Sequence, residues 1–359
     1  MFGSFDNVDF KGIIAAIPRN FVETDSYEDK FGASTVKKFK KAVGVLKRPV
    51  AIPEQTTSDL CYAAADKLIE HLSWDRDTID AIVFVTQTPD YFLPASACVL
   101  QHRLGLSEEC LAFDINLGCS GYIYGAYVAC SLIQGGIRRV LLLTGDVLNT
   151  KKSDDDRSVA MLFGDAGTAT ALEVTSNKKT NFLLRTDGSG FKHFIIPAGA
   201  LRNPNGSHEL SEWGVGINRN DFHIYMNGAE IFNFSVNKPV YAHIDFINNF
   251  KLDENDIDLF IFHQANKFII DGIAQRLSIP AEKVPISIDR FGNTNSATIP
   301  LTIVDACASR TNENLKMVLN GFGVGLSWGV MSIEINTNIC LPIIYTDDYF
   351  KEGALERVF

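Results

Sequence analysis

The sequence lacks the features of a membrane-spanning, secreted or nucleic-acid-binding protein. No apolar run approaches the roughly 20 residues that cross a bilayer, and the opening MFGSFDNVDF holds neither a basic cluster nor a long apolar stretch. The formal net charge is -10, whereas nucleic-acid binding calls for a basic surface. We therefore expect a cytoplasmic protein that binds neither membranes nor nucleic acid.

Paired cysteines are also missing. The seven cysteines are scattered without a CxxC motif, at Cys61, Cys98, Cys110, Cys119, Cys130, Cys307 and Cys340. Such a set is typical neither of a disulfide framework nor of a zinc site. We expect most of them to be small buried apolar residues and predict no metal site.

Alternating strand and helix signals run along all 359 residues, of which 46% are hydrophobic. Short apolar runs bounded by turn residues predict buried strands, and apolar residues at helical spacing predict helices. The expected strands are 79–88, 111–115, 139–144, 169–174 and 258–262, and the expected helices are 58–72 and 121–133. This alternation indicates an α/β protein.

Two segments of the second half resemble segments of the first. DTIDAIVFVTQTPD at 77–90 resembles NDIDLFIFHQANK at 255–267, and FGDAGTATALEV at 163–174 resembles FGVGLSWGVMSIE at 322–334. Two matches in the same order predict an internal duplication. We expect two similar α/β halves, 1–176 and 177–359, with an active site where they face each other.

Three segments stand apart from this pattern. Residues 197–221 are rich in Gly, Asn and Pro and predict a long loop. Residues 341–359 form a polar and aromatic C-terminal extension to which no function is assigned. Residues 36–49, VKKFKKAVGVLKRP, hold six basic residues and no acidic one, which indicates either a solvated face or a docking patch for a phosphorylated or acidic partner.

Cys119 is the first candidate catalytic residue. It lies in DINLGCSGYIYG, between a predicted strand and a predicted helix that Cys119 itself is expected to open. The positive end of a helix dipole and free backbone N–H groups favour the thiolate, which is the nucleophilic form of cysteine. The alternative is a tight turn that holds a buried cysteine.

His263 and Asn293 are the other two candidates. His263 in IFHQAN ends a predicted strand, and Asn293 in DRFGNTNSATIP lies in turn-forming sequence. Taken alone, the first can be a structural histidine and the second a turn or cap residue. Together with Cys119 they supply a nucleophile, an imidazole and a carboxamide.

These three groups suit one chemistry. Cys119 can carry an acyl group as a thioester, while His263 and Asn293 donate hydrogen bonds to the carbonyl of a second thioester. Such donors stabilise the enolate that forms when a malonyl group loses carbon dioxide. The backbone N–H groups of Cys119 and Val324 can stabilise the oxyanion that forms when the enolate attacks.

Five motifs occur in one order: NLGCSGYIYG, RSVAMLFGDAG, HQAN, GNTNSATIP and GFGVGLSWG. By these motifs, residues 10–336 resemble β-ketoacyl-acyl carrier protein synthase III, a condensing enzyme of the thiolase fold. The resemblance implies a duplicated five-layered αβαβα fold, a homodimer, no metal or redox cofactor, and acyl-CoA and malonyl-acyl carrier protein as substrates. It implies that Cys119 is the acylated nucleophile and that His263 and Asn293 serve decarboxylation.

The resemblance also implies substrate-binding residues, with departures from the family pattern. Arg157 corresponds to an arginine that holds the adenine of coenzyme A; its usual tryptophan partner is absent near Lys38, and Phe39 is the nearest substitute. Gly228 matches, but Ala229 replaces an asparagine. These changes leave open whether the primer arrives on coenzyme A or on a carrier protein.

Two further departures concern the carrier protein and the acyl pocket. After HQAN, which ends in the expected substrate-binding residue Asn266, Phe268 stands where the family has an arginine. Leu93 stands where a phenylalanine closes the acyl pocket from the partner subunit, which predicts a primer other than acetyl.

Two alternatives remain open at this stage. A related acyltransferase could pass the Cys119-bound acyl group to a hydroxyl or amine, with His263 as general base and no release of carbon dioxide. A thiolase-fold scaffold partner of another synthase would have no activity, but such partners usually lack the nucleophile.

Overall fold

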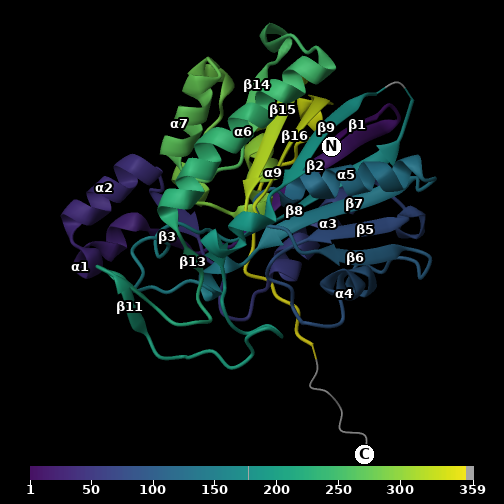
Figure 1. Cartoon of the computed structure of the whole chain (residues 1–359). Coiled ribbons are helices and arrows are strands. Elements are labelled where there is room, and N and C mark those ends of the chain that lie inside the picture. The colour runs from purple at the N-terminus through teal and green to yellow at the C-terminus, as the bar shows by residue number, and fades with distance from the viewer. Residues whose placement is uncertain (177, 353–359) are drawn as a thin grey trace, which may run out of the picture.

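The computed structural model describes residues 1–176 and 178–352, and its core consists of two large sheets and three helical layers (Figure 1), with three two-stranded sheets beside them. One sheet has the order β17-β2-β8-β7-β5-β6, and the other has the order β1-β9-β16-β15-β14. This five-layered arrangement confirms the αβαβα fold that the resemblance implies.

The strands of the first sheet are largely continuous apolar runs, as expected for a sheet covered by helices on both faces. Their bounds are β2 Val8–Ile17, β5 Ala81–Val85, β6 Leu111–Ile115, β7 Arg139–Asp146, β8 Ala166–Val174 and β17 Ile344–Tyr345. Strand β5 is shorter than the predicted 79–88, because Thr86 to Asp90 turn away from the sheet.

The second sheet is built in the same way. Its strands are β1 Phe2–Phe5, β9 Thr180–Thr186, β14 Leu259–Phe262, β15 Asn314–Gly323 and β16 Ser327–Asn336. Strands β14 and β15 are parallel, whereas β15 and β16 form an antiparallel pair that turns at residues 324–326.

Helices cover both outer faces and fill the space between the sheets. Helices α5 Gly121–Gln134 and α9 Thr298–Cys307 lie between the sheets, where each contacts strands of both. Helices α3 Thr57–Leu72 and α4 Ser96–Arg103 cover the first sheet, and α6 Gly228–Phe250 with α7 Lys267–Arg276 covers the second. The large apolar cluster between the sheets therefore holds the two halves together.

The predicted duplication agrees with the strand order. The series β2-β8-β7-β5 in one sheet corresponds to β9-β16-β15-β14 in the other. Of the segments matched by sequence, one pair contains β5 and β14 and the other contains β8 and the start of β16, and the strands of each pair occupy equivalent places. The chain ends cross over, because β1 joins the second sheet and β17 joins the first. From this repeat we infer halves of 1–176 and 177–359 that exchange their outermost strands; residue 177 itself lies outside the described residues.

Short elements form the rim of the molecule. They are α1 Glu28–Phe31, α2 Ala33–Val43, α8 Ile288–Phe291, β3 Phe21–Glu23, β4 Lys47–Pro49, β10 Phe194–Ile195, β11 Ser211–Gly214, β12 Ile217–Arg219 and β13 Tyr225–Met226. The predicted loop at 197–221 thus contains an antiparallel hairpin, β11–β12. Sequence periodicity missed this hairpin because each strand is only three or four residues long.

Candidate active site

The three candidate catalytic residues follow the ends of separate elements. Cys119 lies between β6 and α5, His263 directly follows β14, and Asn293 lies between α8 and α9. All three are buried, with exposed fractions of 4%, 1% and 4%.

The segment 293–298 connects these residues. The Asn295 side-chain oxygen Oδ1 accepts a hydrogen bond from the Cys119 thiol at 3.0 Å, and the Asn295 backbone N–H donates to Asn293 Oδ1 at 2.9 Å. Thr298 Oγ1 lies 2.7 Å from His263 Nδ1. One short segment therefore contacts the thiol and the imidazole and contributes the third residue itself.

The Cys119 sulfur is held in a tight backbone environment. The backbone N–H groups of Val324 and of Cys119 itself point toward it. Gly323 packs directly on Cys119, because a Cβ atom there would lie 2.7 Å from the sulfur. These contacts leave the sulfur facing the two N–H groups named as the candidate oxyanion hole.

Two predictions about Cys119, that it opens the helix and that it is a thiolate, were wrong. Helix α5 begins at Gly121, so Cys119 precedes the helix instead of opening it. Burial, together with the charge of Asp146, raises the pKa of the Cys119 thiol to about 12, although the neighbouring N–H groups act in the opposite direction. The resting group is a thiol, since desolvation outweighs the donors.

His263 is a neutral imidazole. Its complete burial lowers its pKa to about 3, because an imidazolium there would lose its hydration. The ring stands edge-on to Phe322, with centroids 5.6 Å apart, and Thr298 holds Nδ1. Such a ring can exchange hydrogen bonds with a substrate through Nε2 without carrying charge.

Asp146 was missed by the sequence analysis. It ends β7 and is fully buried, and it accepts hydrogen bonds from Ser296 Oγ at 2.7 Å and from the Gln87 backbone at 2.7 Å. Burial raises the pKa of this carboxyl group to about 6 despite these donors. The only signal in the sequence was an aspartate at the end of an apolar strand, RVLLLTGD.

Arg157 and Phe39 lie at the rim of the molecule. Arg157 is exposed, and its backbone N–H donates to the Gly216 carbonyl in the hairpin β11–β12 at 3.0 Å. Phe39 is half-buried on α2 and packs against an apolar cluster that includes Val45 and Leu148. The two residues therefore lie on different rim segments.

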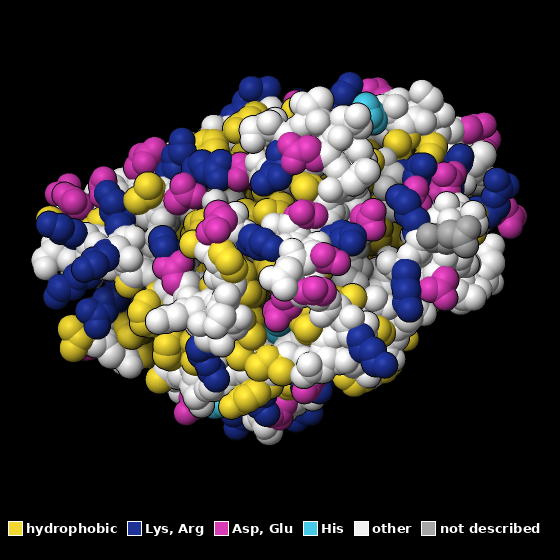
Figure 2. Space-filling model, turned by 90° about the horizontal axis from the view of Figure 1, so that it is seen from above, with side chains coloured by type: hydrophobic (Ala, Val, Ile, Leu, Met, Phe, Trp, Pro, Cys, Tyr) yellow, Lys and Arg dark blue, Asp and Glu magenta, His cyan; other side chains and the backbone are white. Residues whose placement is uncertain are grey.

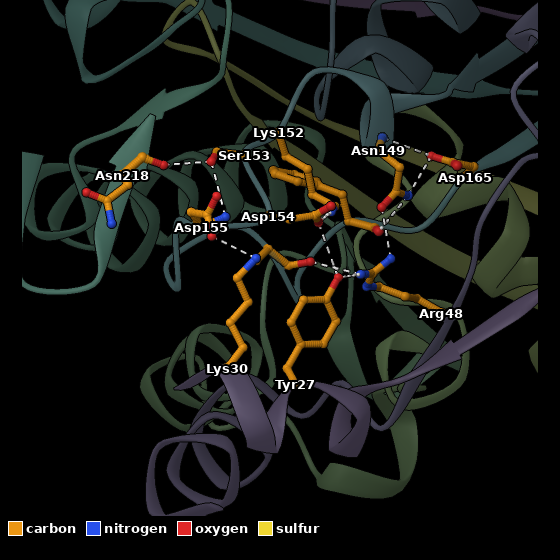
Figure 3. Close-up of polar contacts among 12 residues, drawn as sticks. Tyr27, Lys30, Arg48, Asn149, Lys152, Ser153, Asp154, Asp155, Asp165 and Asn218 are labelled. Carbon is orange, nitrogen blue, oxygen red and sulfur yellow. Dashed lines mark hydrogen bonds and ion pairs between the residues drawn. The ribbon is translucent and has the colours of Figure 1, made fainter. Parts of the chain in front are cut away.

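Polar contacts join these rim segments (Figure 3). The buried Arg48 guanidinium donates to Asn149 Oδ1 at 2.8 Å and to the Tyr27 hydroxyl at 2.7 Å. Lys30 of α1 pairs with Asp155 at 2.8 Å, and Ser153 Oγ donates to a hairpin carbonyl at 2.6 Å. The α1–α2 region, the 149–157 segment and the hairpin thus form one connected rim.

The packing of the rim leaves only part of the basic stretch 36–49 on the surface. Arg48 is buried, and Lys47 lies over the Phe21 ring at 5.0 Å. The exposed basic face consists of lysines of α2, namely Lys37, Lys38 and Lys41. Figure 2 shows Lys and Arg side chains gathered at the left end of the molecule, where α1 and α2 lie in Figure 1. The surface patch is therefore smaller than the six residues of the sequence suggest.

Two further residues predicted to bind substrate, Gly228 and Asn266, lie at the starts of helices. Gly228 is exposed at the start of α6, with no atom near the place of a Cβ. Asn266 caps α7, since its Oδ1 accepts the Ile269 N–H at 2.7 Å. The position of Gly228 is compatible with contact to a large ligand, while the oxygen of Asn266 is already used by the helix.

Leu93 lies in the exposed loop between β5 and α4. It is 82% exposed, and its neighbour Phe92 is 89% exposed. The loop borders a cavity of about 700 Å³, whose lining also includes Gln87. The Asn295 side chain lies between Gln87 and Cys119, and its Nδ2 donates to Gln87 Oε1 at 3.3 Å.

Comparison with known proteins points to one family. Residues 113–188 match the family described as 3-oxoacyl-(acyl-carrier-protein) synthase III, and residues 247–335 match its C-terminal part. In the described part of the chain, no helix is long and apolar enough to cross a membrane.

Individual relatives agree with the family match. The chain is 35% identical over 331 residues to a putative 3-oxoacyl-(acyl-carrier-protein) synthase 3 of Campylobacter jejuni, covering 90% of this chain and 93% of the relative. It is 34% identical to a β-ketoacyl-(acyl-carrier-protein) synthase III of Staphylococcus saprophyticus, covering 91% and 99%. The crystal structure of a 3-oxoacyl-(acyl-carrier protein) synthase from Burkholderia xenovorans superposes with a TM-score of 0.90 at 37% identity, covering 96% and 99%.

Proposed function

We propose that this chain, which belongs to the 3-oxoacyl-(acyl-carrier-protein) synthase III family, condenses an acyl-CoA primer with malonyl-acyl carrier protein to a β-ketoacyl-acyl carrier protein. The observation that supports this most directly is the segment 293–298. It contacts the Cys119 thiol and the His263 ring, and it contributes Asn293. A nucleophile and two candidate hydrogen-bond donors thus share one buried network.

In the first half-reaction, Cys119 attacks the thioester carbonyl of the primer. The bond from sulfur to the acyl carbon forms, the bond from that carbon to the coenzyme A sulfur breaks, and the thiol proton ends on the departing coenzyme A. The backbone N–H groups of Cys119 and Val324 are the proposed donors to the intermediate oxyanion. No metal or redox cofactor is required by these steps.

In the second half-reaction, His263 and Asn293 donate hydrogen bonds to the thioester carbonyl of the malonyl group. They stabilise the enolate that remains when the bond to the carboxylate breaks and carbon dioxide leaves. The enolate carbon then bonds to the acyl carbon on Cys119, the bond from that carbon to the sulfur breaks, and the sulfur leaves as a thiolate that takes up a proton from solvent. A neutral imidazole can donate through Nε2 only when Nδ1 is an acceptor. For this donation, the Thr298 hydroxyl must turn its single proton from the Asn295 carbonyl, 3.0 Å away, to Nδ1 of His263.

The partners follow from the exposed surface. The α2 lysines Lys37, Lys38 and Lys41 suit the phosphates of coenzyme A or an acidic carrier protein, and Arg157 and Gly228 lie exposed for contact with coenzyme A. The exposed Phe92 and Leu93 are large apolar residues on a loop tip. We infer a homodimer in which a second copy covers this loop.

The comparisons favour condensation over the two alternatives, since the relatives named above are synthases of this type. Transfer of the acyl group to a hydroxyl or amine would need the same Cys119 but no decarboxylation. A scaffold without activity has no use for a buried thiol beside candidate oxyanion donors.

The test is a mass-spectrometric product assay with a panel of acyl-CoA thioesters and malonyl-acyl carrier protein. We expect a β-ketoacyl product on the carrier protein and released carbon dioxide, and no β-ketoacyl product with Cys119→Ala. Acylated Cys119 without a condensation product would contradict the proposal and support transfer to another acceptor. Absence of any adduct or product with primers on either coenzyme A or carrier protein would support the scaffold.

A further inference from the structure

The nucleophile has a side-chain partner that the mechanism above does not use. The Cys119 thiol donates a hydrogen bond to Asn295 Oδ1 at 3.0 Å, and both residues are buried. Because the sulfur is the reacting atom, whatever holds its proton affects the first chemical step.

The Asn295 backbone is fixed on both sides. Its N–H donates to Asn293 Oδ1 at 2.9 Å, and its carbonyl accepts from Thr298 Oγ1 at 3.0 Å. Its φ angle is +53°, a left-handed conformation that asparagine tolerates better than most residues. The carboxamide is therefore presented to the sulfur from a rigid turn.

Gln87 contacts the other end of this carboxamide. Asn295 Nδ2 donates to Gln87 Oε1 at 3.3 Å, so Oδ1 is left toward Cys119. The Gln87 backbone is anchored by its hydrogen bond to Asp146. Gly118 makes room for the pair, because a Cβ there would lie 2.3 Å from Gln87 Oε1 and 2.7 Å from Asn295 Oδ1.

We propose that Asn295 is a further catalytic residue, which, oriented by Gln87, holds the Cys119 nucleophile as a thiol until the primer arrives. A carboxamide oxygen stabilises the thiol, which has a proton to donate, and repels the thiolate, which has none. Acylation breaks this contact, because the S–H bond is replaced by the S–C bond and the proton leaves with coenzyme A.

This inference rests on the proposed function only for its effect on the reaction with the primer, since the hydrogen bond between the thiol and Asn295 can be tested without any substrate. The probe is iodoacetamide, which reacts with the thiolate. The measurement is the rate of Cys119 modification against pH, followed by peptide mass spectrometry in the full-length protein. Peptide mapping separates Cys119 from the other six cysteines.

The first variant is Asn295→Gly, which keeps the left-handed backbone and removes the acceptor. We expect its alkylation profile to move to lower pH by at least about one unit, which is about tenfold faster modification at a fixed pH below the pKa. An unchanged profile in a folded variant would overturn the proposal.

The second variant is Gln87→Met, which has similar volume and cannot fix the amide. The freed carboxamide can turn its N–H toward the sulfur, so we expect a shift in the same direction without a new cavity. This variant separates loss of the acceptor from entry of water, and it decides the question if Asn295→Gly does not fold. A wild-type profile in Gln87→Met, or a lower melting temperature with no shift, would contradict the assigned role.

The outcome is independent of condensation. If the variants show the shifted profile but the wild-type protein makes no β-ketoacyl product, the role of Asn295 is supported and the proposed function is contradicted. If the variants keep the wild-type profile and the wild-type protein condenses normally, the proposed function is supported and the role of Asn295 is contradicted.

Discussion

At the scale of single residues, burial decides the protonation states of the site. Cys119 and His263 are both uncharged at rest, because desolvation raises the pKa of one and lowers that of the other. Charge must therefore develop only during the reaction, next to hydrogen-bond donors already in position.

Removing either proposed decarboxylation residue should separate the two half-reactions. We expect His263→Ala and Asn293→Ala to keep acylation of Cys119 while losing condensation by about 10²- to 10³-fold, the usual cost of one oxyanion donor. Single-turnover acylation and product formation, both followed by mass spectrometry, measure the two steps. Equal loss of both steps would contradict the assignment.

The lowered pKa of His263 also predicts that the stability of the protein depends on pH. Its folded pKa of about 3 lies below the unfolded value of 6.5, so the unfolded chain binds the proton more tightly and stability falls as pH falls through that window. Between pH 6.5 and 5 this loss amounts to about 1.6 kcal/mol. We expect urea unfolding to show a smaller loss over this range for His263→Gln, which cannot take the proton; parallel curves for the two proteins would show that His263 is not the cause.

At the scale of elements, the C-terminal extension is part of the fold. Residues 341–352 run along the first sheet and α3, where Gln55 Nε2 donates to the Thr346 and Asp348 carbonyls at 3.1 and 3.0 Å. The Phe350 N–H donates to Asp59 Oδ1 at 2.9 Å. Residues 353–359 of the predicted extension lie outside the described residues.

Phe350 should be the residue that matters most in this extension. The Arg103 guanidinium lies between the Tyr62 and Phe350 rings, 4.6 Å from each centroid, and also pairs with Asp59 at 2.9 Å. We expect Phe350→Ala to lower the free energy of unfolding by about 1 kcal/mol, as typical for a partly exposed cation–π contact. The neighbouring Tyr349→Ala is the matched control and should cost less; equal losses in chemical denaturation would contradict a specific role of Phe350.

At the scale of the whole molecule, the proposed dimer depends on the loop that carries Phe92 and Leu93. A charge on a loop tip that a second copy buries is costly, because the charge loses its hydration without gaining a partner. We therefore expect Phe92→Asp to be monomeric by sedimentation velocity at concentrations where the wild type is dimeric.

The control is Leu201→Asp in the 197–221 region, since Leu201 is 97% exposed and lies outside this loop. It should leave the oligomeric state unchanged. A dimeric Phe92→Asp variant would show that the loop lies outside the interface.

The layers and the three candidate residues could be predicted from the sequence alone. Strands and helices such as 111–115, 58–72 and 121–133 were predicted to within a residue or two, because apolar periodicity reflects which faces are buried. The repeated segments predicted two equivalent sheets, because a duplicated chain keeps its pattern of buried strands. Their exchanged end strands, β1 and β17, could not be predicted, since two to four residues carry no periodic signal.

The protonation state and the partners of the nucleophile could not be predicted, because they depend on tertiary packing. A helix N-terminus suggested a thiolate at Cys119, but desolvation depends on every element packed around the sulfur and has no local sequence signal. Asn295, Gln87 and Asp146 reach the site from turns and strand ends separated by up to 208 residues. Such contacts follow from how the two sheets and α5 pack together, and short-range pattern cannot specify them.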